Sequence, residues 1–232
     1  MKRNILLLIM VGLLSGSVFA QKFYTTSSGE LILSMAEINS GDLPTPQNIV
    51  RFSPWFNLQS LGNYDFGKNF GMFFGLNVRN VGFIAKDNQT QIKKKYRVYD
   101  LGIPIGVKLG QMDWFFVYGG YEFELPFNYK EKTFENEVKT GKFNVWFSNR
   151  VPTYYHAVFV GLQFPYGANL KFKYYLTPFH NTDFTEIQDG VEVKPYKHLE
   201  ANVFYIALSF TMFRNSKVYY KQSPKYVRVR VD

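Results

Sequence analysis

Apolar and polar residues alternate with a period of two along most of the chain. Between residues 70 and 79 one face carries large apolar side chains and the other carries glycine and polar residues: Phe70, Met72, Phe74, Leu76 and Val78 against Gly71, Gly75, Asn77 and Arg79. This period is typical of β-strands, and helical periodicity is hard to find. We predict eight strands, at residues 30–38, 48–60, 69–84, 96–109, 114–126, 154–164, 169–177 and 200–213.

The connections between these segments also alternate in length. Residues 110–113 and 165–168 form short connections, and 61–68 forms a moderate one. The other connections are longer and polar, the longest of them at 128–153 and 178–199. Short turns at one end and long loops at the other are typical of outer-membrane barrels. The pattern therefore predicts an all-β fold, an eight-stranded antiparallel up-and-down transmembrane β-barrel with both termini in the periplasm.

Charged residues fall on the face of these strands opposite the apolar one. Alternate residues of a barrel strand point into the lumen, whereas Arg or Lys on the lipid face at mid-membrane costs about 2–4 kcal/mol. The interior of eight strands is only wide enough for side chains to fill it. We therefore expect a plugged lumen with an ion-pair network, in which glycines such as Gly71, Gly75, Gly102 and Gly106 give room to long charged neighbours. The candidate network is Arg51, Arg79, Asp100, Lys108, Glu122, Glu124, Lys171 and Lys173.

Two prolines conflict with this fold. Pro54 and Pro104 lie inside predicted strands, and proline cannot donate to a strand ladder. We expect a bulge or a ladder break at each. A soluble two-sheet or lipocalin-like binding protein would hold the prolines more easily, but its apolar face would point inward.

The ends of the chain differ from its middle. Residues 1–20 have a basic start, an apolar stretch too short for a comfortable transmembrane helix, and small residues at the end, which is the pattern of a signal peptide. We assign residues 21–213 to the barrel and 214–232 to a basic periplasmic tail. There is no cysteine, and aromatic residues make up 19% of the chain, a composition that favours strands and membrane interfaces.

Four segments carry a family resemblance: "YDFGKNFGMFFGLNVRNVGFI" (64–84), "YRVYDLGIPIGVKLG" (96–110), "FFVYGGYEFELPFNYK" (115–130) and "AVFVGLQFPYGANLKFKYYL" (157–176). In these segments the chain resembles the small outer-membrane β-barrel proteins of Bacteroidetes, the PorT-like family, which share the eight-stranded OmpA/OmpX type of barrel. The resemblance implies an outer-membrane location and, for some members, a role in protein secretion or envelope assembly. No motif in it is catalytic.

The sequence predicts neither a catalytic site nor a cofactor or metal. A lipid-modifying enzyme at the rim, with His156 as base and Ser148 as the nearest serine, stays open as an alternative, as does a narrow pore. Asp183, Glu186, Asp189 and Glu192 do not have the spacing of an EF-hand loop. Lys93–Lys95 could meet lipopolysaccharide phosphates or only solubilise their loop.

The sequence bears on three kinds of partner: lipid, protein and nucleic acid. Outer-membrane lipid is expected on the barrel wall. A protein partner is a second possibility, through the 214–232 tail, since "YVRVRV" alternates and could add a strand to a sheet edge. Nucleic acid is excluded for an exported chain, although the formal net charge is +9.

Overall fold

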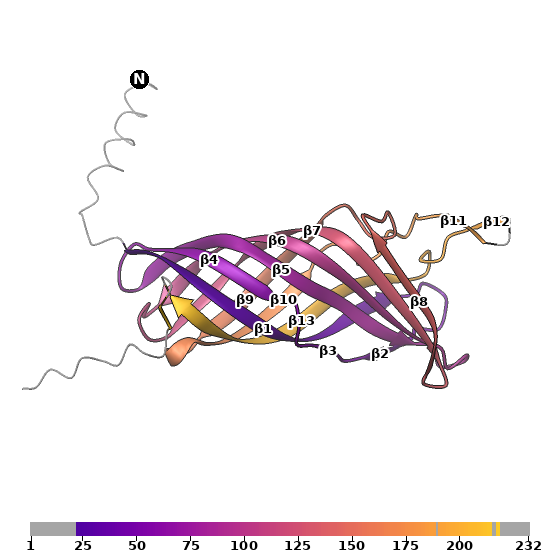
Figure 1. Ribbon diagram of the computed structural model, residues 1–232, viewed down its shortest axis with the longest axis horizontal. Coiled ribbons are helices and arrows are strands. Elements are labelled where there is room, and N and C mark those ends of the chain that lie inside the picture. The colour runs from indigo at the N-terminus through magenta and orange to yellow at the C-terminus, as the bar shows by residue number, and fades with distance from the viewer. Residues whose placement is uncertain (1–21, 189, 215–216, 219–232) are drawn as a thin grey trace, which may run out of the picture.

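The computed structural model describes residues 22–188, 190–214 and 217–218. The predicted signal peptide and most of the predicted tail lie outside these residues. Eight long strands form a closed antiparallel ring in the order β1-β4-β5-β6-β7-β9-β10-β13, and β13 pairs with β1 to complete it. This confirms the predicted all-β, eight-stranded up-and-down barrel (Figure 1). The ring strands are β1 (Lys22–Asn39), β4 (Leu58–Asp65), β5 (Phe70–Lys86), β6 (Lys93–Gly110), β7 (Phe116–Glu135), β9 (Tyr155–Gln163), β10 (Ala168–Tyr175) and β13 (Glu200–Arg214).

Further secondary-structure elements lie outside this ring of eight strands. Five of the six additional strands are β2 (Gln47–Ile49), β3 (Arg51–Ser53), β8 (Val138–Trp146), β11 (Glu186–Gln188) and β12 (Val191–Val193). A two-residue strand β14 (Lys217–Val218) pairs with β13, and one 3₁₀ turn, η1, covers Pro165–Gly167. No helix among the described residues is long and apolar enough to cross a membrane.

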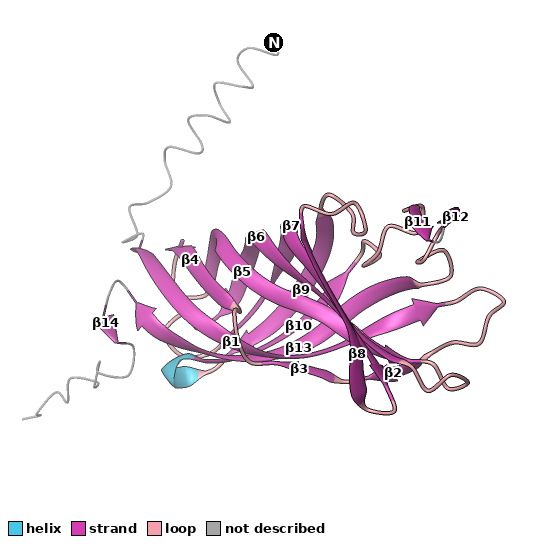
Figure 2. Cartoon of the chain, turned by 45° about the vertical axis from the view of Figure 1, so that its right-hand side comes forward, coloured by secondary structure: helices cyan, strands magenta, loops and turns pink. Residues whose placement is uncertain are grey.

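The two ends of the barrel differ. The start of β1 and the end of β13 lie at the left in Figure 1, at the end where short turns join β4 to β5, β6 to β7 and β9 to β10. The β7–β8 hairpin and the segment with β11 and β12 extend from the other end, as Figure 2 also shows. We call these the turn end and the loop end. Three of the four connections at the loop end, residues 40–57, 136–154 and 176–199, are long as predicted, but the fourth, residues 87–92, is about as short as the turns at the other end.

The outer wall is apolar, whereas the lumen buries charged and polar side chains in addition to aromatic ones. On β6 the outward residues Leu101, Ile103, Ile105, Val107 and Leu109 are exposed, while the residues between them are buried. The eight steps from Leu101 to Leu109, at about 3.4 Å each, span about 27 Å along the strand, or about 20 Å along the barrel axis at a tilt of about 40°. This height is close to the apolar band of transmembrane barrels. A soluble barrel would reverse this arrangement.

The second predicted strand is wrong in detail. Residues 48–60 do not form one strand: β2 pairs with β5, β3 pairs with β1, and the ring strand β4 begins only at Leu58. Pro54 lies in the interruption, as the missing donor predicts. The segment 61–65, which we assigned to a connection, belongs to β4.

Pro104 is accommodated more gently. β6 stays continuous, but its ladder with β5 passes from Phe74↔Ile105 to Asn77↔Gly102 without pairing Pro104 to Gly75. The predicted ladder break at this proline is therefore confirmed. The bulge in β6–β7 lies elsewhere, between Tyr99 and Asp100.

The longest predicted loop is also different. Strand β7 runs on to Glu135 and pairs with β8 from Asn128↔Trp146 to Glu135↔Val138. Most of residues 128–153 thus form a hairpin that extends the barrel wall.

Candidate functional site in the lumen

The middle of the lumen holds a cluster of ion pairs. Arg79 pairs with Glu30, with Glu122 (Nε–Oε1 3.0 Å) and with Glu124 (Nε–Oε1 3.6 Å). Lys173 pairs with Glu122 at 2.9 Å and also with Glu124, and Lys171 pairs with Glu30. All six side chains are at most 4% exposed. Because these groups come from β1, β5, β7 and β10, the cluster ties together strands from opposite sides of the ring.

Two glycines make room for this arrangement. A Cβ on Gly102 would collide with the Glu122 carboxylate and the Asn77 amide, and one on Gly71 would lie 2.6 Å from Asp65 Oδ1 and 2.8 Å from Lys108 Cε. These two positions have the predicted role. Gly106 instead gives room to the ring of Phe73.

Asp100 is the unusual member of the predicted network. Its side chain is completely buried, yet it forms no ion pair and neither carboxylate oxygen has a hydrogen-bond partner among the described residues. It lies across the ladder from Arg79. The central cluster with Asp100 thus contains four carboxylates (Glu30, Asp100, Glu122 and Glu124) and three cations (Arg79, Lys171 and Lys173).

The remaining two predicted residues lie outside the central cluster. Lys108 is nearer the turn end, where its Nζ pairs with Asp65 and lies 3.2 Å from both Tyr24 Oη and Asn63 Oδ1. Arg51 pairs with no carboxylate of the described residues: it donates to the carbonyl oxygen of Asn80 at 3.1 Å and to the side chain of that residue. Arg51 therefore does not belong to the ion-pair network.

Arg51 has a structural role at the interrupted strand. Residues 79–83 of β5 lie between the part paired with β4 and the part paired with β2. Side chains bond this backbone in place of a neighbouring strand, since Asn80 N donates to Asn57 Oδ1 at 2.9 Å and Ser53 Oγ donates to Asn80 O at 3.2 Å. Ser34 Oγ likewise donates to Gly82 O at 2.6 Å. Together with Arg51, these contacts replace a missing piece of strand.

Sequence reasoning missed Glu30 and Asp65. Glu30 begins the predicted first strand and lies an even number of residues from Ser34 and Ala36, two small buried residues. Since alternate residues of a strand share a face, this spacing could have placed Glu30 inside. Asp65 was assigned to a connection because the start and end of β4 were misplaced.

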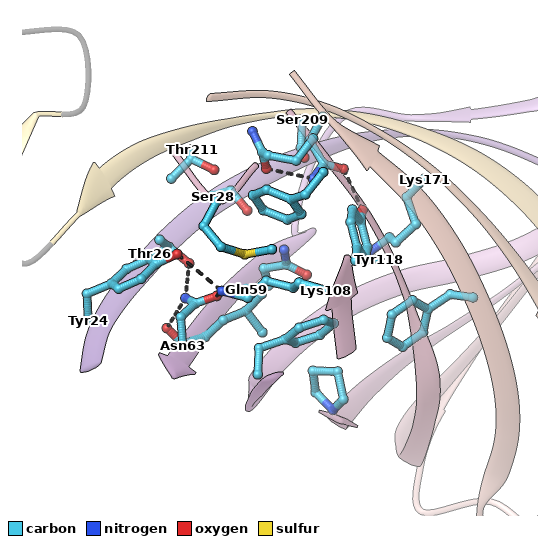
Figure 3. A pocket seen from close by; sticks show the side chains of 18 of the residues that line it. Tyr24, Thr26, Ser28, Gln59, Asn63, Lys108, Tyr118, Lys171, Ser209 and Thr211 are labelled. Carbon is cyan, nitrogen blue, oxygen red and sulfur yellow. Dashed lines mark hydrogen bonds between the residues drawn. The ribbon is translucent and has the colours of Figure 1, made fainter. Parts of the chain in front are cut away.

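A cavity of about 60 Å³, lined by both polar and apolar side chains, opens the lumen toward the turn end (Figure 3). This volume suffices for about four water molecules. Its wall is linked by hydrogen bonds from Asn63 Nδ2 to Thr26 Oγ1 (3.0 Å) and from Tyr118 Oη to Asn169 Oδ1 (2.6 Å). The labelled lining residues are Tyr24, Thr26, Ser28, Gln59, Asn63, Lys108, Tyr118, Lys171, Ser209 and Thr211.

An aromatic plug closes the lumen at the loop end. The connection from β10 to β13 folds back inside, and Phe179, His180 and Tyr196 are buried there. The His180 ring stacks on Tyr196 with centroids 4.2 Å apart, and Tyr155 Oη donates to Phe179 O at 2.7 Å. The plug also contains Phe83, Tyr96, Tyr129 and Tyr175. We predicted a long polar connection at 178–199, but this part of it is packed core.

The side chains named above as possible catalytic or metal-binding groups bond to other residues of the chain. His156 Nδ1 bonds to Tyr121 Oη, and Ser148 Oγ accepts from Arg150 N at 3.3 Å. Asp183 pairs with Lys194, and Glu186 pairs with Arg150. Asp189 lies outside the described residues. No group of three His, Cys, Asp or Glu side chains suited to a metal ion occurs in the described part of the chain.

The comparisons with known proteins give fold neighbours only. No protein-family model and no curated protein sequence matches the chain. Among solved structures, Ail, the attachment invasion locus protein of Yersinia pestis, is similar at 12% identity and a TM-score of 0.35, over 83% of this chain and 99% of that one. Neisserial surface protein A is similar at 7% identity and a TM-score of 0.37, over 86% and 100%. The outer membrane protein OprG from Pseudomonas aeruginosa is similar at 10% and 0.35, over 81% and 94%. Identities and scores this low carry no information about activity or partners.

Proposed function

We propose that the chain is a non-catalytic outer-membrane β-barrel that acts through its surfaces, as a structural or accessory component of protein secretion or envelope assembly. Its membrane location is supported by the apolar outer wall, since exposed Phe, Leu, Ile and Val cover ring strands whose inward residues are charged. Both described ends of the ring lie at the turn end, which fits termini in the periplasm.

The observation that carries the surface role is the closed lumen. Arg79 and its carboxylate partners fill the middle, and the plug around Phe179 and His180 fills the loop end. A side-chain-filled barrel offers no pathway for a solute, so its loops, wall and termini are what remain available to partners. The PorT-like resemblance favours a secretion role among the possible surface roles.

The test is partner capture in cells with the full chain and with a chain lacking residues 214–232. We expect envelope or secretion proteins to be cross-linked to the full chain, and fewer of them to the shortened one. The two chains are compared at equal amounts of folded barrel, measured as the band whose mobility in an SDS gel changes on boiling. Steady ion conductance of the purified barrel in a planar bilayer would favour the narrow pore instead. Altered lipid A in a deletion strain, restored by the full chain but not by a His156→Ala variant, would favour the rim enzyme.

A further inference from the structure

A row of cations crosses three neighbouring strands on the outer wall near the loop end. Lys95 on β6 is the register partner of Lys132 on β7, which is in turn the partner of Lys142 on β8. One step toward the turn end, Arg97 faces Lys130. Cross-strand partners point to the same face, and like charges in such pairs are destabilising. We call these five residues the basic row.

The basic row has little internal compensation. Among the described residues, none of its five members forms an ion pair; the neighbouring pairs join Lys93 to Glu137 and Lys94 to Glu131 instead. Lys95 lies over the ring of Phe134, with Nζ 4.8 Å from the centroid. An arrangement that repels itself fits an anion supplied from outside the chain.

A pocket of about 440 Å³ continues the basic row across β5 to the interrupted strand. Lys95, Arg97 and Arg51 contribute to its lining, together with Ser53 and Asn80. Arg51 is only 6% exposed, and its hydrogen bonds go to neutral acceptors of Asn80 and Ser53. The pocket therefore places a buried guanidinium, which has no carboxylate partner in the described part of the chain, beside two further cations.

The surroundings of the pocket are apolar and aromatic. Trp55 and Phe52, which also line it, are 74% and 60% exposed. On the turn-end side of the basic row, aromatic rings follow the wall in three contacts: Phe56 to Tyr99, edge to face (centroids 5.8 Å), Tyr99 to Phe127, tilted (6.5 Å), and Phe127 to Trp146, stacked (5.8 Å). Aromatic rings of this kind mark the membrane–water interface.

Along β6 the order of outward residues follows the depth profile of a bilayer. The apolar belt ends at Leu101, Tyr99 comes next, and Arg97, Lys95 and Lys93 follow toward the loop end. Cations at this height lie where lipid headgroups carry their phosphates, whereas loop tips would face soluble anions. The position favours a lipid over a soluble polyanion.

We propose that the basic row and the Arg51 pocket bind the phosphate groups of an anionic membrane lipid, with the exposed rings of Phe52 and Trp55 against its acyl chains. This inference rests on the proposed membrane location. Arginine and lysine together suit this ligand, because the guanidinium can bond phosphate in a bidentate way and the lysines add point charges.

The test uses the mature chain in phosphatidylcholine nanodiscs doped with bis-phosphorylated or dephosphorylated lipid A, with retained lipid counted by native mass spectrometry. The variant R97Q/K130Q/K132Q removes three cations of the basic row. The matched control, K68Q/K194Q/K197Q, removes three exposed lysines at the turn end and in the 178–199 connection. We expect the parent and the control to prefer the phosphorylated lipid, and the basic-row variant to bind it about 10- to 100-fold more weakly.

Several results would overturn the inference. One is equal retention of the two lipids by the parent, and another is an equal loss in the control variant. Competition by millimolar inorganic phosphate would point to a free anion, and tighter binding of soluble dextran sulfate would point to a polysaccharide. Barrel formation is checked separately in each sample, by comparing the gel mobility of boiled and unboiled protein. A barrel that shows the heat-dependent shift but does not prefer the phosphorylated lipid would refute this inference without contradicting the proposed membrane location.

Discussion

At the scale of single residues, Arg79 shows why a guanidinium lies in an apolar stretch. Its strand has two faces, and the inward face brings Arg79 to three carboxylates, Glu30, Glu122 and Glu124. Charges removed from water are tolerated when they are paired and hydrogen-bonded. Such a pair adds little net stability, but breaking it by removing one partner is costly.

Replacing Arg79 therefore tests the cluster. Arg79→Met would leave Glu30 and Glu122 with fewer partners, and we expect the free energy of unfolding in urea to fall by about 3–5 kcal/mol. Lys194→Gln is the matched control, because the Lys194–Asp183 pair is exposed and such pairs contribute about 0–1 kcal/mol. Equal, small losses in the two variants would contradict the central role of Arg79.

Asp100 gives the opposite expectation. Its carboxylate has no hydrogen-bond partner among the described residues and lies in a cluster with one more carboxylate than cations. Asp100→Asn removes an uncompensated charge at nearly constant volume, so we expect unchanged or higher stability in the same urea titration. Glu122→Gln, which weakens ion pairs to Arg79 and Lys173, should lower stability. A loss in Asp100→Asn as large as in Glu122→Gln would show that Asp100 has a partner.

Parity predicted which side of the wall a residue faces better than it predicted partners. It placed Arg79, Glu122, Glu124, Lys171 and Lys173 on the inner face, where the structure has them buried. Partners depend on stagger around the ring, which one sequence does not show. Glu30 lies 141 residues from Lys171 along the chain, yet the two pair, and no local pattern connects them.

At the scale of elements, the regular alternation of apolar and polar residues predicted the ring strands. The shorter strands outside the ring were not predicted, because their pairing is irregular. Pro54 indicated an interruption in the second predicted strand. The start of β4 at Leu58 was not predicted, because it follows from pairing with β1 and β5. We predicted a loop for the β7–β8 hairpin because charged and polar residues are mixed with its apolar ones. Beyond the apolar wall, a strand no longer needs an apolar face, so the periodic signal disappears.

The connection between β10 and β13 carries a pH-sensitive group. Burial, with Lys94 and Arg150 nearby, holds the pKa of His180 well below its usual range. The folded plug therefore binds fewer protons than the unfolded chain, and its stability is full above about pH 6.5 and falls below that by about 1.4 kcal/mol per pH unit.

We expect proteolysis of the 178–199 connection to quicken between pH 7 and pH 5. His180→Phe keeps an aromatic ring on Tyr196 and cannot take up the proton, so its proteolysis should vary less over the same interval. The protease is calibrated at each pH on the unfolded chain. Identical pH profiles for the parent and the variant would rule out His180 as the responsible group.

At the scale of the whole molecule, the fold is a tube with an inside and an outside of opposite character. The inside has three layers from the turn end to the loop end: a small cavity, a charged middle and an aromatic plug. The outside has an apolar belt, rings and a basic row in the same direction. A strand-built protein satisfies all its backbone groups in lipid only when its strand ladder is closed, so barrel closure between β1 and β13 is the feature on which membrane insertion depends.

The most direct measurement is the gel mobility of the protein from isolated outer membranes, run boiled and unboiled in SDS. A closed barrel keeps its strand ladder in SDS until it is heated, so we predict a heat-dependent shift, and the protein should be found in the membrane fraction. A protein that is recovered soluble from the periplasm and migrates identically before and after boiling would contradict the membrane-spanning barrel.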